Sequence, residues 1–194
     1  MAEAQKNLPA GARRVYKGVI YDIWQWEQTL FDGSMAPFER LVRPDSAQVI
    51  AVSGDRILLQ KQRQPDWTDY GITLPGGRID EGETPLAGAQ RELYEEGGYE
   101  SHDWDLLQKF SPSSHFFWTV YTFVARRCVK TAAPALEAGE QIEELAVTFE
   151  EFLSYGENPA LRNHDIKPLL VKARYNETYR REFHAFLFRG KSNR

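Results

Sequence analysis

A glycine-rich turn followed by a helix crowded with acidic residues constrains this chain more than any other feature. Pro75-Gly76-Gly77 opens a loop that runs to Thr84-Pro85, where threonine can cap a helix and proline suits its first turn. Strong helix formers fill residues 86–96, and Gly97-Gly98 follows as a helix stop. The sequence therefore predicts one central helix entered from a tight glycine loop.

Three glutamates of this predicted helix share one face. Glu92, Glu95 and Glu96 stand at i, i+3 and i+4, so their carboxylates repel one another and at least one pKa is expected to rise. A solvated acidic face is the ordinary explanation of such a cluster. The alternative is a site for Mg²⁺ or Mn²⁺, with the backbone of Gly76 and Gly77 close to the metal and to bound phosphates.

The residues that flank the glutamates form a longer pattern with fixed spacing. From Gly77 it continues through Glu83, Arg91-Glu92-Leu93, Glu95-Glu96, Gly98 and Tyr99. This pattern resembles the complete Nudix box. The resemblance implies the Nudix fold, an α/β/α sandwich around a mixed sheet, and hydrolysis of a nucleoside diphosphate linked to another group. Glu83 and Arg91 fall at the family's bracing positions, and Arg91 is expected to brace the loop by pairing with Glu83.

The same resemblance implies the metal ligands. Glu92 and Glu96, together with the Gly76 carbonyl, should hold Mg²⁺, for which Mn²⁺ can substitute, and Glu95 should assist as a further ligand. Glu92, Glu95 and Glu96 are then expected to act in catalysis by positioning the cation that activates water and clamps the diphosphate.

Three features outside the box resemble the branch of ADP-ribose pyrophosphatases and nucleoside-diphosphate-sugar hydrolases. They are an aromatic N-terminal hairpin followed by Phe38-Glu39-Arg40, the run Leu58-Leu59-Gln60-Lys61-Gln62-Arg63, which resembles the strand leading into this branch's Gln-x-Arg segment, and Ser111-Pro112 beyond the box. In that branch the N-terminal sheet packs across a dimer. The chain departs from the branch at Ser113-Ser114, which stands where a glycine is usual.

The expected substrate-binding residues are Arg40, Arg63, Trp24, Gly77 and Pro112. A guanidinium grips phosphate or ribose oxygens well, although surface ion pairs would equally account for Arg40 and Arg63. Trp24 and Trp26 alternate in a predicted strand and share one face. Core packing is the first explanation for them, and stacking of Trp24 on adenine in a partner subunit is the alternative.

The general base is expected in the acidic segment before residue 145. It contains Glu137, Glu140, Glu143 and Glu144, and we select Glu140 because the branch carries its base on a mobile acidic loop after the box. An ordinary solvated loop is the competing explanation.

Elsewhere the chain is expected to alternate between strands and helices in an α/β (α+β) fold. Residues 15–31 should form a hairpin closed at Asp32-Gly33. Further strands are expected at 47–53, 57–61, 72–74, 104–110, 116–125 and 145–149, and helices at 150–155, 165–175 and 177–188. We divide the chain into an N-terminal β extension, residues 1–45, for dimerisation and the substrate pocket, and a Nudix hydrolase domain, residues 46–194.

Composition narrows the function further. A net charge of -4 over 194 residues argues against a nucleic-acid partner and favours a small nucleotide substrate. Cys128 is the only cysteine, which excludes an internal disulfide. We expect no membrane span, a cytoplasmic location and a homodimer.

The sequence thus predicts a Mg²⁺-dependent hydrolase that splits the pyrophosphate bond of ADP-ribose or another nucleoside-diphosphate sugar. The products would be a nucleoside monophosphate and a sugar phosphate. The alternatives are a Nudix hydrolase of dinucleoside polyphosphates, NADH or capped RNA, and a non-catalytic nucleotide-sugar sensor. The intact glutamates argue against the sensor.

Overall fold

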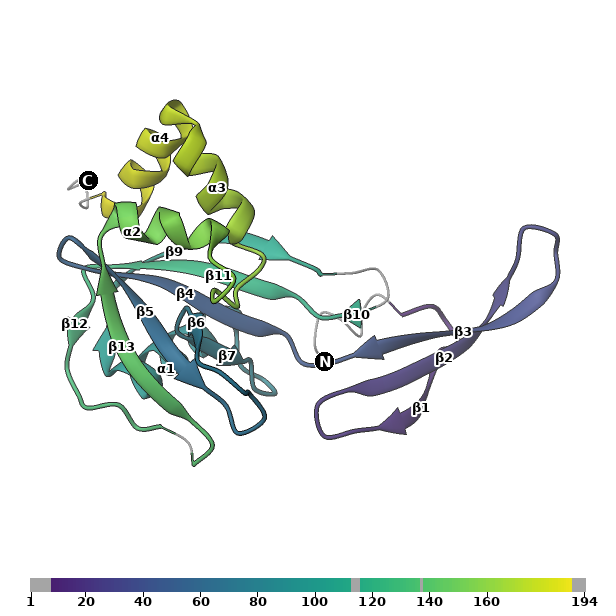
Figure 1. Ribbon diagram of the computed structural model, residues 1–194. Helices are drawn as coiled ribbons and strands as arrows, with labels where there is room; N and C mark the ends of the chain where they lie inside the picture. The colour runs from purple at the N-terminus through teal and green to yellow at the C-terminus, as the bar shows by residue number, and fades with distance from the viewer. Residues whose placement is uncertain (1–7, 113–115, 137, 190–194) are drawn as a thin grey trace.

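The fold is described from a computed structural model, which covers residues 8–112, 116–136 and 138–189. Over these residues a central mixed sheet carries helices on both faces, and a second sheet extends from one end of it (Figure 1). The expected α/β/α sandwich with an N-terminal antiparallel extension is confirmed.

The central sheet has the strand order β13-β5-β4-β11-β9, with β6 paired to β5 and β7 paired to β4. Its neighbours run antiparallel except β4 and β11, which run parallel. The strands are β4 (Ser46–Ser53), β5 (Arg56–Arg63), β6 (Gly71–Thr73), β7 (Gly76–Arg78), β9 (Asp103–Phe110), β11 (Val120–Arg126) and β13 (Gln141–Val147). A small separate pair joins β8 (Tyr99–Glu100) to β12 (Val129–Lys130).

Each face of the central sheet buries its own hydrophobic cluster. Helix α1 (Pro85–Gly97) covers one face, where Ala89 and Leu93 pack on alternate residues of β4 and β11. The C-terminal helices cover the other face and pack on Ile50, Leu59 and Val124. They are α2 (Phe149–Ser154), the 3₁₀ turn η2 (Tyr155–Glu157), α3 (Lys167–Tyr175) and α4 (Glu177–Phe188). Alternation along the strands therefore supplies both layers of the sandwich.

The N-terminal sheet has the order β1-β2-β3-β10. Its strands are β1 (Arg13–Lys17), β2 (Asp22–Thr29), β3 (Met35–Val42) and β10 (Phe116–Phe117). The predicted turn at Asp32-Gly33 does close a hairpin, between β2 and β3, and Gly33 there has a φ of 86°. The expected hairpin was too short, because residues 15–31 span most of β1, a turn and β2, and the strand that follows the Asp32-Gly33 turn is β3.

Two strand predictions need correction. The strand expected over residues 116–125 is broken: β10 ends at Phe117 and β11 begins at Val120, because the Thr119 N–H turns to the Asp45 carboxylate at 2.7 Å. The strand expected at 145–149 occupies Gln141–Val147 instead. It ends because Thr148 caps α2 with a reciprocal capping box to Glu151.

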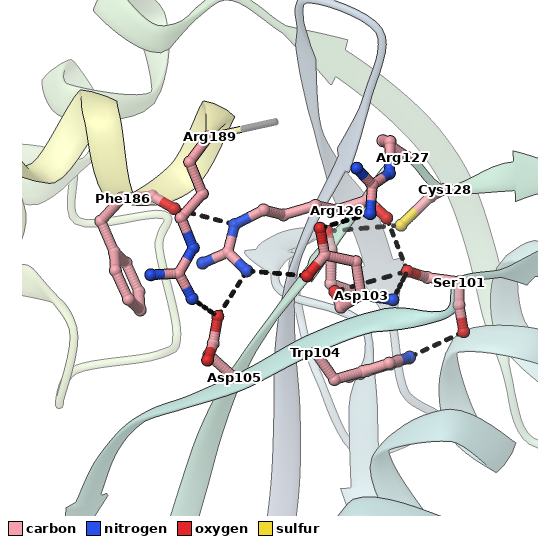
Figure 2. A network of polar contacts seen from close by, with 10 residues as sticks. Ser101, Asp103, Trp104, Asp105, Arg126, Arg127, Cys128, Phe186 and Arg189 are labelled. Carbon is pink, nitrogen blue, oxygen red and sulfur yellow. Dashed lines mark hydrogen bonds and ion pairs between the residues drawn. The ribbon is translucent and has the colours of Figure 1, made fainter. Parts of the chain in front are cut away.

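A buried arginine fastens α4 to the edge of the central sheet (Figure 2). Arg126 is 1% exposed and donates from Nε to the Phe186 carbonyl at 2.8 Å. Its Nη1 donates to Asp105 at 2.5 Å and to Asp103 at 3.4 Å. Arg189, just beyond α4, also pairs with Asp105. A hydrogen-bonded ion pair thus joins β9, β11 and the C-terminal helix.

Within the described residues, no helix combines the length and the apolar character needed to cross a lipid bilayer.

Candidate active site

Helix α1 begins and ends where its capping residues require. The Thr84 hydroxyl accepts from the Ala87 N–H at 3.1 Å, and Gly98 adopts the left-handed conformation (φ 72°) and donates to the Tyr94 carbonyl. Leu93 is fully buried against the sheet. The glutamates on this side of the helix are thereby directed toward the glycine turn between β6 and β7, where Glu96 meets Gly76 and Glu92 meets Gly77.

Glu96 is the most deeply placed acid of this helix. It is 5% exposed, and its Oε2 accepts from the Gly76 N–H at 2.8 Å and from Gln60 Nε2 at 3.0 Å. Burial raises the pKa of Glu96 to about 8, against the opposing effect of these two hydrogen bonds. The sequence predicted a raised pKa from mutual repulsion, whereas removal from water is the larger cause.

The glycine turn lies tightly between β4 and the helix. At Gly76, where φ is 152°, a Cβ would lie 2.3 Å from the Ala47 carbonyl oxygen and 2.6 Å from Gln48 Cα. At Gly77 a Cβ would lie 2.4 Å from Glu92 Oε1. Gly76 therefore needs glycine because backbone atoms fill the space, whereas a side chain at Gly77 would push the Glu92 carboxylate away from the turn.

Arg91 sits between the acids and braces the loop. Its guanidinium donates to Glu83 at 3.1 and 3.2 Å and to the Arg78 carbonyl at 2.8 Å. The same group reaches Glu92 at 2.9 Å and Glu95 at 3.0 Å. The pKa of Glu92 is raised mainly by burial, and Arg91 counteracts this rise. Arg91 thus contacts Glu83 as expected and also supplies positive charge to two of the cluster glutamates.

Of the four acids in the segment that precedes residue 145, Glu140 interacts electrostatically with the glutamates of the cluster. Its negative charge contributes to the raised pKa of both Glu92 and Glu96. Glu143 instead pairs with Lys61 at 3.1 Å, and Glu144 accepts from the Tyr99 hydroxyl at 2.9 Å and pairs with Lys130. Glu137 lies outside the described residues. Glu140 is therefore the acid of this segment that shares the electrostatic environment of the cluster.

The donor set at this site suits a hard divalent cation. Glu92, Glu95, Glu96 and the Gly76 carbonyl offer oxygen only, which is the ligand type that Mg²⁺ and Mn²⁺ prefer. Over the described part of the chain, no three acidic, histidine or cysteine side chains converge as a ready chelate. The carboxylates of Glu92 and Glu95 do not converge because the Arg91 guanidinium lies between them. The buried, desolvated Glu96 is the acid with most to gain from a cation.

The residues predicted to bind substrate fall into two groups. Gly77, Arg63 and Pro112 belong to the strands and loops of the central sheet, whereas Trp24 and Arg40 belong to the N-terminal sheet. Gly77 lies in the site itself. Arg63 lies at the end of β5, with its guanidinium 5.9 Å from the Tyr70 ring. Pro112 is exposed beyond β9.

Trp24 and Arg40 lie opposite each other in the β2–β3 ladder, in the sheet that extends away from α1 (Figure 1). Arg40 stacks on Phe117, 4.2 Å from the ring centre. The indole N–H of Trp24 is buried without a hydrogen-bond partner among the described residues. One chain alone therefore does not bring these two residues to the acids.

Sequence analysis missed the polar residues that hold Glu96. Gln60 is 3% exposed, and Thr73 donates to the side-chain oxygens of Gln60 and Gln62 at 3.3 and 3.1 Å. The signal was available in part, since two glutamines at alternate positions of a strand otherwise rich in leucine share a face and demand polar partners.

This fold, with the glutamates of α1 placed beside a glycine turn, is that of a class of phosphoanhydride hydrolases. The sequence profile of the NUDIX domain matches residues 42–170. The chain belongs to the Nudix family and is a hydrolase related to ADP-ribose pyrophosphatases.

Two relatives and one solved structure are similar to this chain over most of its length. It is 27% identical over 148 residues to an ADP-ribose pyrophosphatase of Bacillus subtilis (strain 168), which covers 75% of this chain and 80% of that protein. It is 26% identical over 145 residues to a methanol dehydrogenase activator of Bacillus methanolicus, which covers 73% of this chain and 78% of that protein. A crystal structure described as an ADP compounds hydrolase superposes with a TM-score of 0.71 and 21% identity, covering 89% of this chain and 94% of the other.

Proposed function

We propose that this protein is a Mg²⁺-dependent hydrolase that cleaves the pyrophosphate bond of ADP-ribose or another nucleoside-diphosphate sugar. The products are a nucleoside monophosphate and a sugar phosphate. The observation that carries the proposal is the position of Glu96, buried under the Gly76 N–H and Gln60 beside Glu92 and Glu140. The relation to an ADP-ribose pyrophosphatase supports the substrate class.

Each residue of the site has a role in this chemistry. Glu92 and Glu96, with the Gly76 carbonyl, would hold Mg²⁺, and Glu95 would assist. Mg²⁺ bound there would supply positive charge for the diphosphate oxygens and make the attacking water more acidic. Glu140 accepts the proton of that water, and Arg91 keeps the loop in place through Glu83 and the Arg78 carbonyl. Gly77 leaves room for Glu92 and for the phosphates.

Substrate recognition is proposed to involve both subunits of a homodimer. The N-terminal extension, residues 1–45, exposes the apolar side chains of Tyr16, Val19, Phe31 and Phe38 at different points along its length, and exposed apolar surface is what a second copy can cover. In such a dimer Arg40 and Trp24 of one subunit would meet the phosphates and the base bound by its partner, while Arg63 and Pro112 line the rim of the same subunit's site. Residues 46–194 supply the hydrolase domain.

The deciding experiment is a substrate panel with Mg²⁺ that measures released nucleoside monophosphate. We expect turnover of ADP-ribose or another nucleoside-diphosphate sugar above that of NADH, diadenosine polyphosphates and capped RNA. Preference for one of the last three would replace the substrate class. Binding of a nucleotide sugar without turnover would identify a sensor.

Glu96→Gln tests the metal site within the same assay. It removes the carboxylate that would bind the cation but keeps the shape of the side chain, and we expect kcat to fall by more than about a hundredfold, since losing even a residue that only supports a metal ligand costs about 10- to 100-fold. Glu81→Gln, on the exposed part of the loop, is the matched control. Near wild-type turnover of Glu96→Gln in saturating Mg²⁺ would refute the assignment.

A further inference from the structure

A second polar cluster, with two buried and three half-buried members, lies on the face of the central sheet opposite α1. Its members are Gln48 of β4, Thr122 of β11, Gln108 of β9, and Asn163 and Asp165 in the segment before α3. Gln48 is 6% exposed and Thr122 is fully buried. Polar groups so placed require partners, and each of them has one.

The hydrogen bonds of this cluster run in one direction. Asp165 Oδ2 accepts from Gln48 Nε2 at 2.7 Å and from Gln108 Nε2 at 2.9 Å. An ionised carboxylate only accepts, so it fixes the amide of Gln48 with its nitrogen toward Asp165. The oxygen of Gln48 is then free to accept from Asn163 Nδ2 at 2.7 Å. The oxygen of Asn163 in turn accepts from the Leu74 N–H at 2.9 Å.

This chain of bonds ends at the glycine turn of the active site. Leu74 stands two residues before Gly76, and the Val49 N–H donates to the carbonyl of the intervening Pro75 at 2.9 Å. Gln48 is the ladder partner of Gly76, whose N–H donates to Glu96 at 2.8 Å. The side chain of Gln48 and its backbone therefore hold the same turn.

We propose that Asp165, Gln48 and Asn163 are positioning residues that fix the backbone from Leu74 to Gly76 and thereby the place of the Gly76 carbonyl and of Glu96. The effect on metal binding rests on the function proposed above, whereas the effect on the backbone does not. If Asp165 could donate as well as accept, the amides of Gln48 and Asn163 could both reverse. The Asn163 nitrogen would then face the Leu74 N–H, donor against donor.

Asn163→Leu and Gln108→Leu form a matched pair. Both exchange a half-buried amide for an apolar side chain of similar size and shorten the cluster, but only Asn163 bonds the turn. We compare deuterium uptake over residues 71–78 without metal or nucleotide, and then kcat, KM and the Mg²⁺ concentration for half-maximal activity. For Asn163→Leu we expect faster uptake, a raised Mg²⁺ requirement and kcat lowered roughly 10- to 100-fold, as for residues that support metal ligands. KM for the nucleotide should stay near that of the wild type.

Gln108→Leu should leave the uptake over residues 71–78 and the Mg²⁺ requirement unchanged. Equal behaviour of the two variants would overturn the proposal, because loss of stability alone would account for both. Asp165→Asn preserves the volume of the side chain and serves if Asn163→Leu does not fold. Asp165→Asn should also speed deuterium uptake over residues 71–78. Uptake equal to that of the wild type would refute the proposal that Asp165 orients the amides of Gln48 and Asn163. Because uptake is measured without substrate, an inactive wild-type protein would refute the proposed function and leave this test intact.

Discussion

Glu96 shows how one residue can be assigned a role by its surroundings. A glutamate on an exposed helix face gains little from a cation, but Glu96 is held away from water with only Gly76 and Gln60 to offset its charge. Burial is the main cause of its raised pKa. The spacing of the glutamates could predict a shared face, but it could not predict burial, which depends on how α1 packs against β4 and β5.

Glu140 and Glu143 allow a sharp test at the residue scale. We expect Glu140→Gln to lower kcat by roughly 100-fold or more at neutral pH, because the attacking water loses its proton acceptor. Glu143→Gln is the control, since that carboxylate pairs with Lys61 on the exposed surface, and its kcat should stay within about twofold, as expected of a surface ion pair. Steady-state kinetics on the preferred substrate distinguish them, and equal rates for the two variants would remove Glu140 from the mechanism.

The elements were predictable where local chemistry decides them. Thr84-Pro85 and Gly98 marked α1 correctly, and the break between the strands expected at 47–53 and 57–61 falls where β4 ends and β5 begins. The failures came from distant partners. The Asp45 carboxylate interrupts the strand at Thr119, and pairing with β5 extends β13 back to Gln141. Neither partner is adjacent in the sequence, so no local pattern could reveal either outcome.

The attachment of α4 leads to a stability prediction at the element scale. Asp105→Asn removes the ionised acceptor of Arg126 and Arg189 (Figure 2). We expect it to lower the free energy of unfolding by roughly 1–2 kcal/mol at pH 7, a value reduced for partial exposure. Glu143→Gln should cost no more than about 0.5 kcal/mol. Urea unfolding followed by circular dichroism measures both.

The ion pairs of Asp105 with Arg126 and Arg189 make their contribution to the free energy of unfolding depend on pH. Burial tends to raise the pKa of Asp105, but Arg126 and Arg189 outweigh it, so the folded-state pKa lies below its ordinary value. The contribution is therefore fully present above pH about 4 and is lost as the pH falls through the lowered pKa. The difference between wild type and Asp105→Asn should shrink on acidification, and a difference that grows instead would contradict this account.

At the scale of the whole molecule, the N-terminal sheet is the surface to test for assembly. Val19 is 98% exposed and Phe31 is fully exposed, and burying a side chain of this size contributes about 1.5–3 kcal/mol. We expect the protein to sediment as a dimer, and the double variant Val19→Asp, Phe31→Asp to raise the dissociation constant at least about tenfold. Val129→Asp, at an exposed site on β12, should have no effect. A monomeric wild type would contradict the dimer.

Two segments of the chain connect the two sheets, and they run parallel to each other. The segment from β3 to β4 lies along the segment from β10 to β11, and the two are tied by the Arg43 N–H to the Phe117 carbonyl and the Ser46 N–H to the Thr119 carbonyl. Removal of residues 1–45 would thus deprive Phe116–Phe117 of its ladder partner and Thr119 of its carboxylate acceptor. A change of length at this crossing would have to occur in both segments together to keep these bonds, so a truncation that removes the extension also disturbs the sheet that remains.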